Sequence, residues 1–585
     1  MKFFRLFLVL SVLCFSAHSQ QDFPQDYFIS PIKLNIAPSG TFGELRSNHF
    51  HSGIDLRING TVGEPIYAVA DGYVSRIRVS SVGGGNMLYI DHPNGFRSVF
   101  FHLDSYEGAI GKYVYDYQYR NKKFEFEVYP EKDKFPVKKG QMVGRGGNTG
   151  SSGGPHLHYE IRLSYNDQTI NPLLFGLKIE DNISPTIKGI HVYAVDTNAP
   201  SGSHTLISNL TKTVKKTIKD KDGKTKTVNT TVNIDTLKAW GTLYFGIDVS
   251  DKSTGSTNNL GVPVIKLYVD DSLYYNYDIK TFRFDQTRNI NSMIDYPTYI
   301  KNKKRYLLTR IAQGNTINII ERTNNNGYFD CTDGKLHKVV YEVSDFNGNT
   351  TKRTFYIQSD ESAQINTTKK DNSEFVITPF YYNTQNNFET EFFSFSAKNG
   401  VLFEDMNFRY KEEKDTLSKY FSDIHHIVQD QPIPVLTSFM VKIKPTDSIP
   451  SQWKKKAIIV NIDNKKLYSE GGTWENEYLT MNTTNFGTFA ISLDTVPPTV
   501  APVNFSNNKS VTPVKFRVKI TDALSGIKSY NCYLNGEWIL AEYDAKINQL
   551  ILDSEKKLKK GSNKLKIVIS DKCDNQTTKE YTLVY

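Results

Sequence analysis

The stretch TGSSGGPHLHYEIRL, residues 149–163, carries the clearest structural signal in the chain. From its first histidine onward it alternates polar and apolar residues, as a half-buried β-strand does. Side chains two residues apart in a strand point to the same side. The apolar side is expected to pack on a core, and the polar side to open to a groove. The polar side carries His156, His158, Glu160 and Arg162.

The glycine-rich segment before this strand is GRGGNTGSSGGP, residues 144–155. It is not a phosphate-binding loop, because it lacks the Gly-Lys-Ser/Thr ending and runs into a strand rather than a helix. Glycines permit positive φ, so the segment can turn sharply and leave room for an extended substrate. Residues 30–180 consist mostly of short apolar runs broken by glycines. We expect an antiparallel β domain with many tight turns.

A second motif, HSGID (51–55), places a histidine four residues before an aspartate. The imidazoles of His51 and His158 and the carboxylate of Asp55 make a three-ligand set. This set suits tetrahedral zinc with the fourth position left to water. Two neutral ligands and one carboxylate leave the site net positive, which acidifies the bound water. A lone histidine is usually structural and each motif alone is weak, but their joint occurrence favours a zinc site.

Together, HSGID, FFHL (100–103) and TGSSGGPHLHYEIR resemble the lysostaphin-type (LytM-like) zinc metallopeptidases, which are peptidoglycan endopeptidases of bacterial cell walls. The resemblance covers roughly residues 40–175, about a quarter of the chain. It implies one zinc ion held by His51, Asp55 and His158.

The same resemblance implies that His102 and His156 activate the water and stabilise the tetrahedral oxyanion. No H-E-x-x-H base is present, so imidazole must transfer the proton. His49 is a rival to His51, but only His51 stands four residues before Asp55. His92 lies in a turn and is expected at the surface.

The function implied is an exported zinc-dependent endopeptidase that hydrolyses peptide cross-links of bacterial peptidoglycan by attack of zinc-bound water. The alternative is a non-catalytic binding or regulatory protein that activates another cell-wall hydrolase. Such proteins usually lose zinc ligands, whereas all five positions are present here. A peptidase acting on proteins outside the wall is a third interpretation.

One departure from a minimal family member is the long stretch Gly111–Pro136. It contains KYVYDYQYRNKKFEFEVYP (112–130), in which aromatic and charged residues alternate. This alternation predicts a β-hairpin. The hairpin would either narrow or occlude the groove, or simply stabilise the surface.

Beyond the peptidase region the sequence repeats weakly. FGIDVSDKSTG (245–255) resembles FRVKITDALSG (516–526), and VVYEVSDFNGNTTKRTFYI (339–357) resembles LKIVISDKCDNQTTKEYTLV (565–584). Each pair begins and ends one module, which predicts two immunoglobulin-like β-sandwiches. The fold class is therefore mainly β: an antiparallel peptidase domain followed by β-sandwich domains. The expected divisions are a signal peptide at 1–19, a peptidase domain at 20–182, a sandwich at 183–360, a β-rich domain at 361–494 and a sandwich at 495–585.

The N-terminus has the pattern of a secretory signal: a basic start, the ten apolar residues 6–15 and a small-residue site ending at Ser19. Leu13 is too large for a lipoprotein site at Cys14. Export to the periplasm is favoured, with an extracellular location as the alternative. No apolar run of about 18 residues follows, so no transmembrane segment is predicted. The net charge of +9 over 585 residues does not indicate a nucleic-acid partner.

Two smaller features complete the prediction. The lysine-rich segment 212–226 is expected to be a protruding hairpin, either solvated or in contact with an anionic polymer. The three cysteines after the signal are too few for a disulfide scaffold. Cys532 and Cys573 form either one disulfide or two buried thiols.

Overall fold

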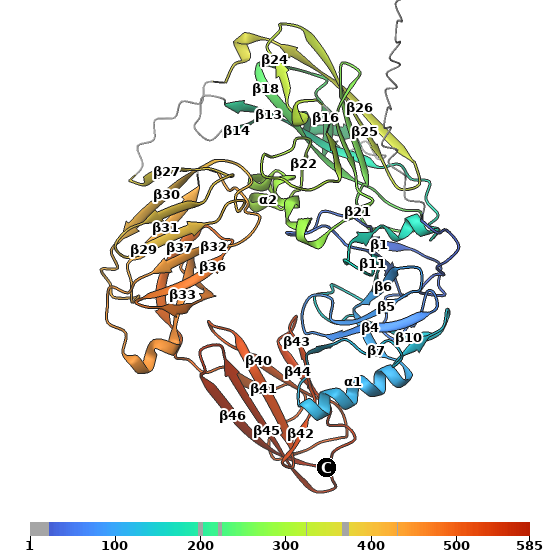
Figure 1. Cartoon of the computed structure of the whole chain (residues 1–585), viewed down its shortest axis with the longest axis vertical. Coiled ribbons are helices and arrows are strands. Elements are labelled where there is room, and N and C mark those ends of the chain that lie inside the picture. The colour runs from blue at the N-terminus through green and yellow to red at the C-terminus, as the bar shows by residue number, and fades with distance from the viewer. Residues whose placement is uncertain (1–22, 197–202, 220–224, 323, 366–373, 430) are drawn as a thin grey trace, which may run out of the picture.

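The computed structural model describes residues 23–196, 203–219, 225–322, 324–365, 374–429 and 431–585. The expected signal peptide lies outside these residues. The chain is mainly β, and four units follow one another around a ring (Figure 1). In the described part of the chain, no helix is long and apolar enough to cross a membrane.

The first unit is built on one antiparallel sheet, as predicted, with the strand order β1-β2-β11-β6-β5-β4-β8. A smaller sheet, β3-β10-β7, packs beside it. The strands of the large sheet are β1 (Pro38–Gly40), β2 (Ile54–Arg57), β11 (His156–Leu163), β6 (Phe96–Phe101), β5 (Asn86–Asp91), β4 (Gly72–Val79), β8 (Phe126–Val128), β9 (Pro136–Val137) and β12 (Thr169–Ile170). Those of the small sheet are β3 (Pro65–Tyr67), β10 (Met142–Gly146) and β7 (Leu103–Tyr106).

The alternating segment after His102 is not a β-hairpin. Residues Gly108–Asn121 form the helix α1, and only β8 at its end joins the sheet. Ile110, Val114 and Gln118 are the buried positions of α1 and stand four residues apart. Aromatic residues at every second position imitate a strand pattern. The buried residues, however, repeat every four positions, as they do along one face of a helix, and the segment is therefore helical.

The second unit packs two sheets face to face and shares a continuous apolar core with the first. One of its strands, β21, pairs with β12 and so extends the sheet of the peptidase unit. One sheet comprises β14 (Ser203–Asn209), β13 (Thr186–Asp196), β18 (Gly241–Ser250), β22 (Leu307–Leu308) and β24 (Phe329–Cys331). The other comprises β17 (Thr236–Ala239), β26 (Thr350–Ser359), β25 (Leu336–Ser344), β19 (Val264–Val269), β20 (Ser272–Asp278) and β23 (Ile320–Arg322). β21 spans Thr281–Phe282, and the helical segments are η2 (Phe284–Ser292), α2 (Tyr296–Asn302) and η3 (Asn325–Gly327).

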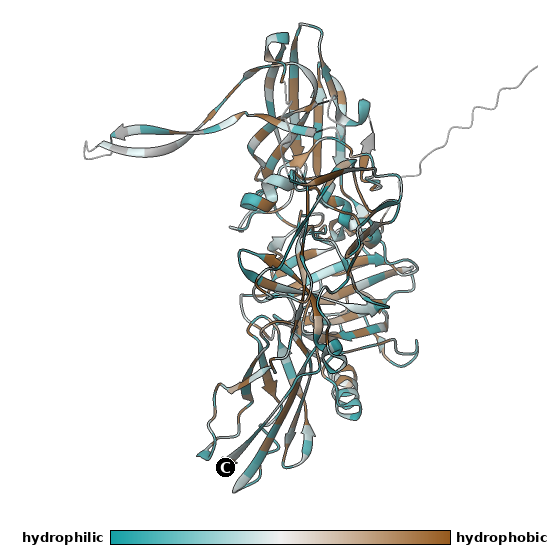
Figure 2. Ribbon diagram, turned by 90° about the vertical axis from the view of Figure 1, so that its left-hand side faces the viewer, coloured by the Kyte–Doolittle hydropathy of each residue, from teal (hydrophilic) through white to brown (hydrophobic). Residues whose placement is uncertain are grey.

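The lysine-rich segment forms the hairpin of β15 (Thr211–Lys219) and β16 (Thr225–Asn233), which confirms that prediction. Figure 2 shows it projecting far from the rest of the chain.

The third and fourth units are also two-layered. One sheet of the third unit comprises β27 (Val376–Phe380), β30 (Met406–Glu413), β31 (Ile424–Gln429), β37 (Gly487–Leu493), β33 (Ala457–Asp463) and β34 (Lys466–Gly471). Its other sheet comprises β28 (Asn386–Glu389), β29 (Phe393–Ala397), β32 (Phe439–Ile443), β36 (Tyr478–Thr483) and β35 (Thr473–Glu475). The fourth pairs β38 (Thr499–Pro502), β40 (Phe516–Thr521), β44 (Gln549–Leu552) and β43 (Ala541–Asp544) with β39 (Lys509–Ser510), β46 (Gln576–Val584), β45 (Ser562–Asp571), β41 (Ile527–Leu534) and β42 (Glu537–Ile539). Cys532 and Cys573 are buried free thiols.

The fourth unit returns to the first and closes the ring at α1. The Tyr119 hydroxyl donates to Asp553 Oδ2 at 2.5 Å, and the Lys557 ammonium lies 4.0 Å from the Tyr119 ring centroid. Lys546 donates from Nζ to the carbonyl of Asn148, in the glycine-rich segment. The C-terminal strands therefore reach the rim of the segment that leads into β11.

A buried ion pair joins the second and third units. The Arg310 side chain is 5% exposed and its Nη1 lies 2.6 Å from Glu404 Oε1. Glu404→Ala would leave a buried guanidinium without its partner, which costs about 3–5 kcal/mol. We expect this variant to unfold at a clearly lower urea concentration than the parent protein. Glu374→Ala, which breaks an exposed pair with Lys411, should leave the curve unchanged. Coincident curves for Glu404→Ala and the parent would contradict the assignment.

Candidate metal centre

Two neighbouring strands place two of the three predicted ligands side by side. β2 and β11 are antiparallel, and their register sets Asp55 directly opposite His158. His51 stands just before β2, and two backbone hydrogen bonds fix it. Its N–H donates to the carbonyl of Glu44, and its carbonyl accepts from the N–H of Gly43. Because directly paired residues point to the same side of a sheet, the carboxylate and the imidazole meet.

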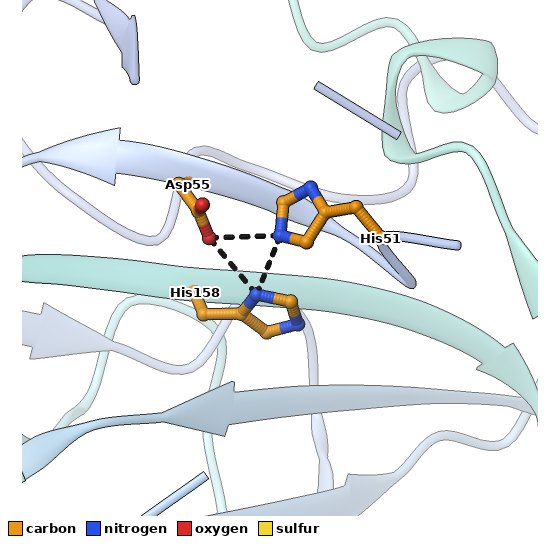
Figure 3. A group of neighbouring side chains, drawn as sticks. All are labelled: His51, Asp55 and His158. Atoms are coloured by element: carbon orange, nitrogen blue, oxygen red, sulfur yellow. Dashed lines mark hydrogen bonds and ion pairs between the residues drawn. The ribbon is translucent and has the colours of Figure 1, made fainter. Parts of the chain in front are cut away.

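The three side chains converge on one point (Figure 3). His51 Nε2, His158 Nδ1 and Asp55 Oδ1 lie 2.9 Å from one another on each side of a triangle. All three residues are buried. Metal-ligand side chains gathered from two strands and a loop in this way make a compact N₂O donor set.

Hydrogen bonds on the far side of each ring fix which nitrogens face the centre. His51 Nδ1 lies 2.7 Å from the carbonyl of Thr41, which can only accept, so this nitrogen carries the proton. His158 Nε2 likewise donates to Glu160 Oε1 at 2.8 Å. The inward nitrogens of the neutral rings therefore present lone pairs to each other and to the Asp55 oxygen. Three electron-pair donors facing one another fit a cation at their centre.

Glu160 orients His158 from a fully buried position. Its carboxylate also accepts from Ser52 Oγ at 2.6 Å and from Arg162 Nε at 2.5 Å. Burial alone would raise the pKa of Glu160, but Arg162 and His158 lower it to about 2. Burial alone would lower the pKa of His158, but hydrogen bonds to Asp55 and Glu160 raise it to about 9. The two carboxylates therefore favour positive charge at this point, which a metal ion bound to His158 Nδ1 would supply in place of a proton.

This arrangement yields a prediction for Glu160→Gln. The amide keeps the shape of the side chain but removes the charge that makes His158 a strong ligand. We expect zinc affinity to fall roughly 10- to 100-fold, measured by competition with a chromogenic chelator. Glu107→Gln, a carboxylate of the same unit that pairs with Arg145, serves as the matched control. Unchanged affinity in Glu160→Gln would contradict this role.

The second oxygen of Asp55 has its own partner. Arg46 Nη2 donates to Asp55 Oδ2 at 3.0 Å and also pairs with Glu44. A Cβ atom on Gly40 would stand 2.5 Å from Asp55 Oδ2 and 2.6 Å from Arg46 Nη2. Gly40 therefore leaves the space in which the arginine turns Oδ1 toward the histidines. Sequence reasoning missed Arg46 and Gly40, which no motif marks.

His102 and His156 flank the triangle. His102 Nδ1 donates to the carbonyl of Thr149 at 2.8 Å, and its ring centroid lies 4.8 Å from that of His156. Burial, followed by the charges of His158 and His156, lowers the pKa of His102 to about 3, so its ring is neutral at pH 7. His102 also adopts a φ of 62°, a left-handed conformation that is rare outside glycine. It joins β6 to β7.

The other flanking ring, His156, begins β11. Its Nδ1 donates to the carbonyl of Gly154 at 2.9 Å, and its Nε2 stands 3.4 Å from Asp55 Oδ1. All five predicted residues therefore lie in one cluster. His49 does not join it: its side chain is exposed, and its Nδ1 donates to the carbonyl of Ser47. His92 was expected at the surface but is buried, bridging Asp71 and Ser98 within the sheet.

Comparison with known proteins finds a family match within the first unit. Residues 49–119 and 126–172 match Peptidase family M23, and residues 377–494 match the Zu5-like domain. The peptidase unit therefore matches the M23 family over these residues, which confirms the resemblance to lysostaphin-type peptidases. The third unit corresponds to the Zu5-like match, whereas the immunoglobulin-like class of the second and fourth units stays a prediction.

Individual relatives match the same region. A DD-carboxypeptidase/endopeptidase Mpg of Neisseria meningitidis is 32% identical over 133 residues, which are 23% of this chain and 24% of the relative. Lysostaphin of Staphylococcus staphylolyticus is 30% identical over 146 residues, 25% of this chain and 23% of the relative. The catalytic domain of the prophage-encoded M23 protein EnpA of Enterococcus faecalis is 28% identical, covering 26% of this chain and 98% of that domain, with a TM-score of 0.19. The chain thus spans about a quarter of these curated relatives.

Proposed function

We propose that this protein is an exported zinc-dependent endopeptidase that cleaves peptide cross-links in bacterial peptidoglycan. The observation that carries the proposal is the convergence of His51 Nε2, His158 Nδ1 and Asp55 Oδ1, each with its lone pair turned inward. Curated relatives named lysostaphin and glycyl-glycine endopeptidase support the reaction class. Export follows from the expected signal peptide, and a periplasmic location is proposed, with an extracellular one as the alternative.

Zinc held by His51, Asp55 and His158 would supply a Lewis acid that polarises a substrate carbonyl and acidifies water. Side chains of the protein would transfer the protons. His102 is neutral, and the proton on its Nδ1 is committed to Thr149, so Nε2 is free to accept a proton from the attacking water. His156 is oriented by Gly154, and its Nε2 points to the same cluster, where it can hold the proton that the leaving amine needs.

The domain divisions at 182/183, 360/361 and 494/495 also stay proposals. The paired sheets fall between these positions, and the Zu5-like match ends at residue 494. The pairing of β12 with β21 crosses the first division. The peptidase unit and the following sandwich are therefore expected to unfold together.

The test uses the chain from residue 20 onward and purified sacculi of a Gram-negative bacterium. Released fragments are identified by mass spectrometry, with and without added zinc. We expect new peptide termini that depend on zinc, and no new glycan ends. His426→Ala, which changes a histidine of the third unit, should cleave like the parent. New reducing sugar ends, or sacculi left intact at saturating zinc, would overturn the proposal.

A further inference from the structure

A second group of ligand atoms lies at the junction between the peptidase unit and the following sandwich. The carboxylates of Asp181, Asp251 and Asp345 bring one oxygen each within 4.8 Å of one another. They line a cavity of about 30 Å³, to which the peptidase unit contributes Thr41 and Asn171. This space is large enough for a single ion or water molecule.

Two buried oxygens at this cavity have no hydrogen-bond partner in the described part of the chain. They are Asp251 Oδ1 and Ser253 Oγ, whose residues are 5% and 2% exposed. The ion pairs of the described residues include none of the three carboxylates. Burial, with the nearby charges of Asp345 and Asp181, raises the pKa of Asp251 to about 7. A buried carboxylate without a counter-charge is costly, so the arrangement calls for a positive partner.

The other two carboxylates are held in place by the backbone around them. Asp345 accepts from the N–H of Asn349 at 2.9 Å and from its side-chain Nδ2 at 2.7 Å. Asp181 Oδ1 accepts from Ile183 at 3.1 Å and from Thr254 at 3.2 Å. A carboxylate offers about four lone-pair positions, so each retains capacity for a ligand. The cluster is therefore fixed rather than assembled from flexible side chains.

We propose that Asp181, Asp251 and Asp345 bind one calcium ion that fastens the first sandwich to the peptidase unit. The donor atoms are all oxygens, which suits a hard cation and not zinc. Three carboxylates, one hydroxyl and water provide the six to eight oxygens that calcium takes. Magnesium demands near-ideal octahedral geometry and usually keeps several waters, so a site supplied mainly by protein oxygens favours calcium.

The repeat in the sequence supplies a natural comparison. Asp494, Asp522 and Asp571 occupy the corresponding positions around the fourth unit and also lie within 4.8 Å of one another. There, however, Lys456 Nζ donates to Asn575 Oδ1 at 2.7 Å, and Asn575 Nδ2 donates to Asp571 Oδ2. An ammonium group is thus linked to the second cluster through the side-chain amide of Asn575. The second cluster also has buried oxygens without a hydrogen-bond partner among the described residues, Asp522 Oδ1 and Ser525 Oγ. No ammonium group is described beside the first cluster, and we therefore place the ion there.

The site is connected to the candidate metal centre through the backbone. Asp251 and Leu260 exchange two backbone hydrogen bonds of 2.9 Å. The next residue, Gly261, donates to Thr41 Oγ1 at 3.0 Å, and the Thr41 carbonyl holds His51. Calcium binding is therefore expected to stiffen the segment that orients one zinc ligand. The proposal itself does not depend on peptidase activity.

The test is isothermal titration of CaCl₂ into the zinc-loaded chain from residue 20 onward, with MgCl₂ in parallel. We expect calcium binding with a Kd within the broad range of protein sites, about 10⁻⁷ to 10⁻³ M, and weaker binding of magnesium. Calcium should also raise the melting temperature in scanning calorimetry. Asp251→Asn should weaken binding at least tenfold and remove the shift, and Asp522→Asn should retain both.

Asp251→Asn is isosteric, and circular dichroism verifies its fold. If it fails to fold, Asp181→Asn, in the more exposed linker, takes its place with the same expectation. The proposal is overturned if 10 mM CaCl₂ gives neither heat nor a melting shift. It is also overturned if the Asp251 or Asp181 variant binds calcium like the parent, or if magnesium binds equally well.

Discussion

His158→Ala is expected to lose the zinc ion and, with it, all measurable cleavage. The substitution removes one of three converging donors and also leaves Glu160 without the imidazole N–H that it accepts at 2.8 Å. Asp55 then faces a single histidine. Two remaining ligands hold zinc far more weakly than three, and structural and catalytic sites alike use at least three protein ligands. Zinc content should fall from about one ion per chain to near zero.

Metal content is measured by mass spectrometry of the desalted protein, and cleavage by peptide release from sacculi. His49→Ala is the matched control, because it changes a histidine two residues from His51 whose Nδ1 bonds only to Ser47 in the described contacts. This control should keep both zinc and activity. Stoichiometric zinc in His158→Ala would show that the ligand set is wrong.

His156→Ala is expected to separate binding from catalysis. The ring stands 3.4 Å from Asp55 Oδ1 but outside the 2.9 Å triangle, so its removal leaves all three ligands in place. Zinc should remain near one ion per chain. The reaction loses a group that transfers a proton, which is worth about 10²- to 10⁴-fold in rate. The loss should fall on kcat more than on KM.

A parallel variant checks that this effect belongs to the ring. His102→Asn keeps a residue that tolerates the φ of 62° and removes the other flanking imidazole. It too should retain zinc and lose rate. Unchanged turnover in His156→Ala at full zinc occupancy would refute its proposed role and leave His102 as the only proton-transferring histidine of the account.

Much of the fold was predictable because it rests on local patterns. Strict alternation from His156 to Arg162 identified β11, and the repeated Asp-containing turns identified hairpins at both β25–β26 and β45–β46. The helix α1 was missed because its exposed tyrosines alternate like strand residues. The four-residue spacing of its buried side chains becomes visible only in the folded unit, where Ile110 and Gln118 are buried.

The candidate site, too, could be predicted only in part from the sequence. Motif spacing indicated His51, Asp55 and His158 as ligands, and the resemblance to lysostaphin-type peptidases added His102 and His156. Arg46 and Thr41 act through contacts with Asp55 and His51 that spacing does not encode. The acidic cluster at the sandwich junction gathers residues 181, 251 and 345, which meet only after two units have packed together.

The most direct test of the central claim is a zinc titration of the metal-stripped chain, following cleavage of a cross-linked wall peptide and bound zinc together. The claim is that His51, Asp55 and His158 hold one ion that is needed for hydrolysis. Activity should be absent without zinc and rise linearly to a plateau at one ion per chain. Full activity in the stripped protein, or a filled site that cleaves nothing, would contradict it.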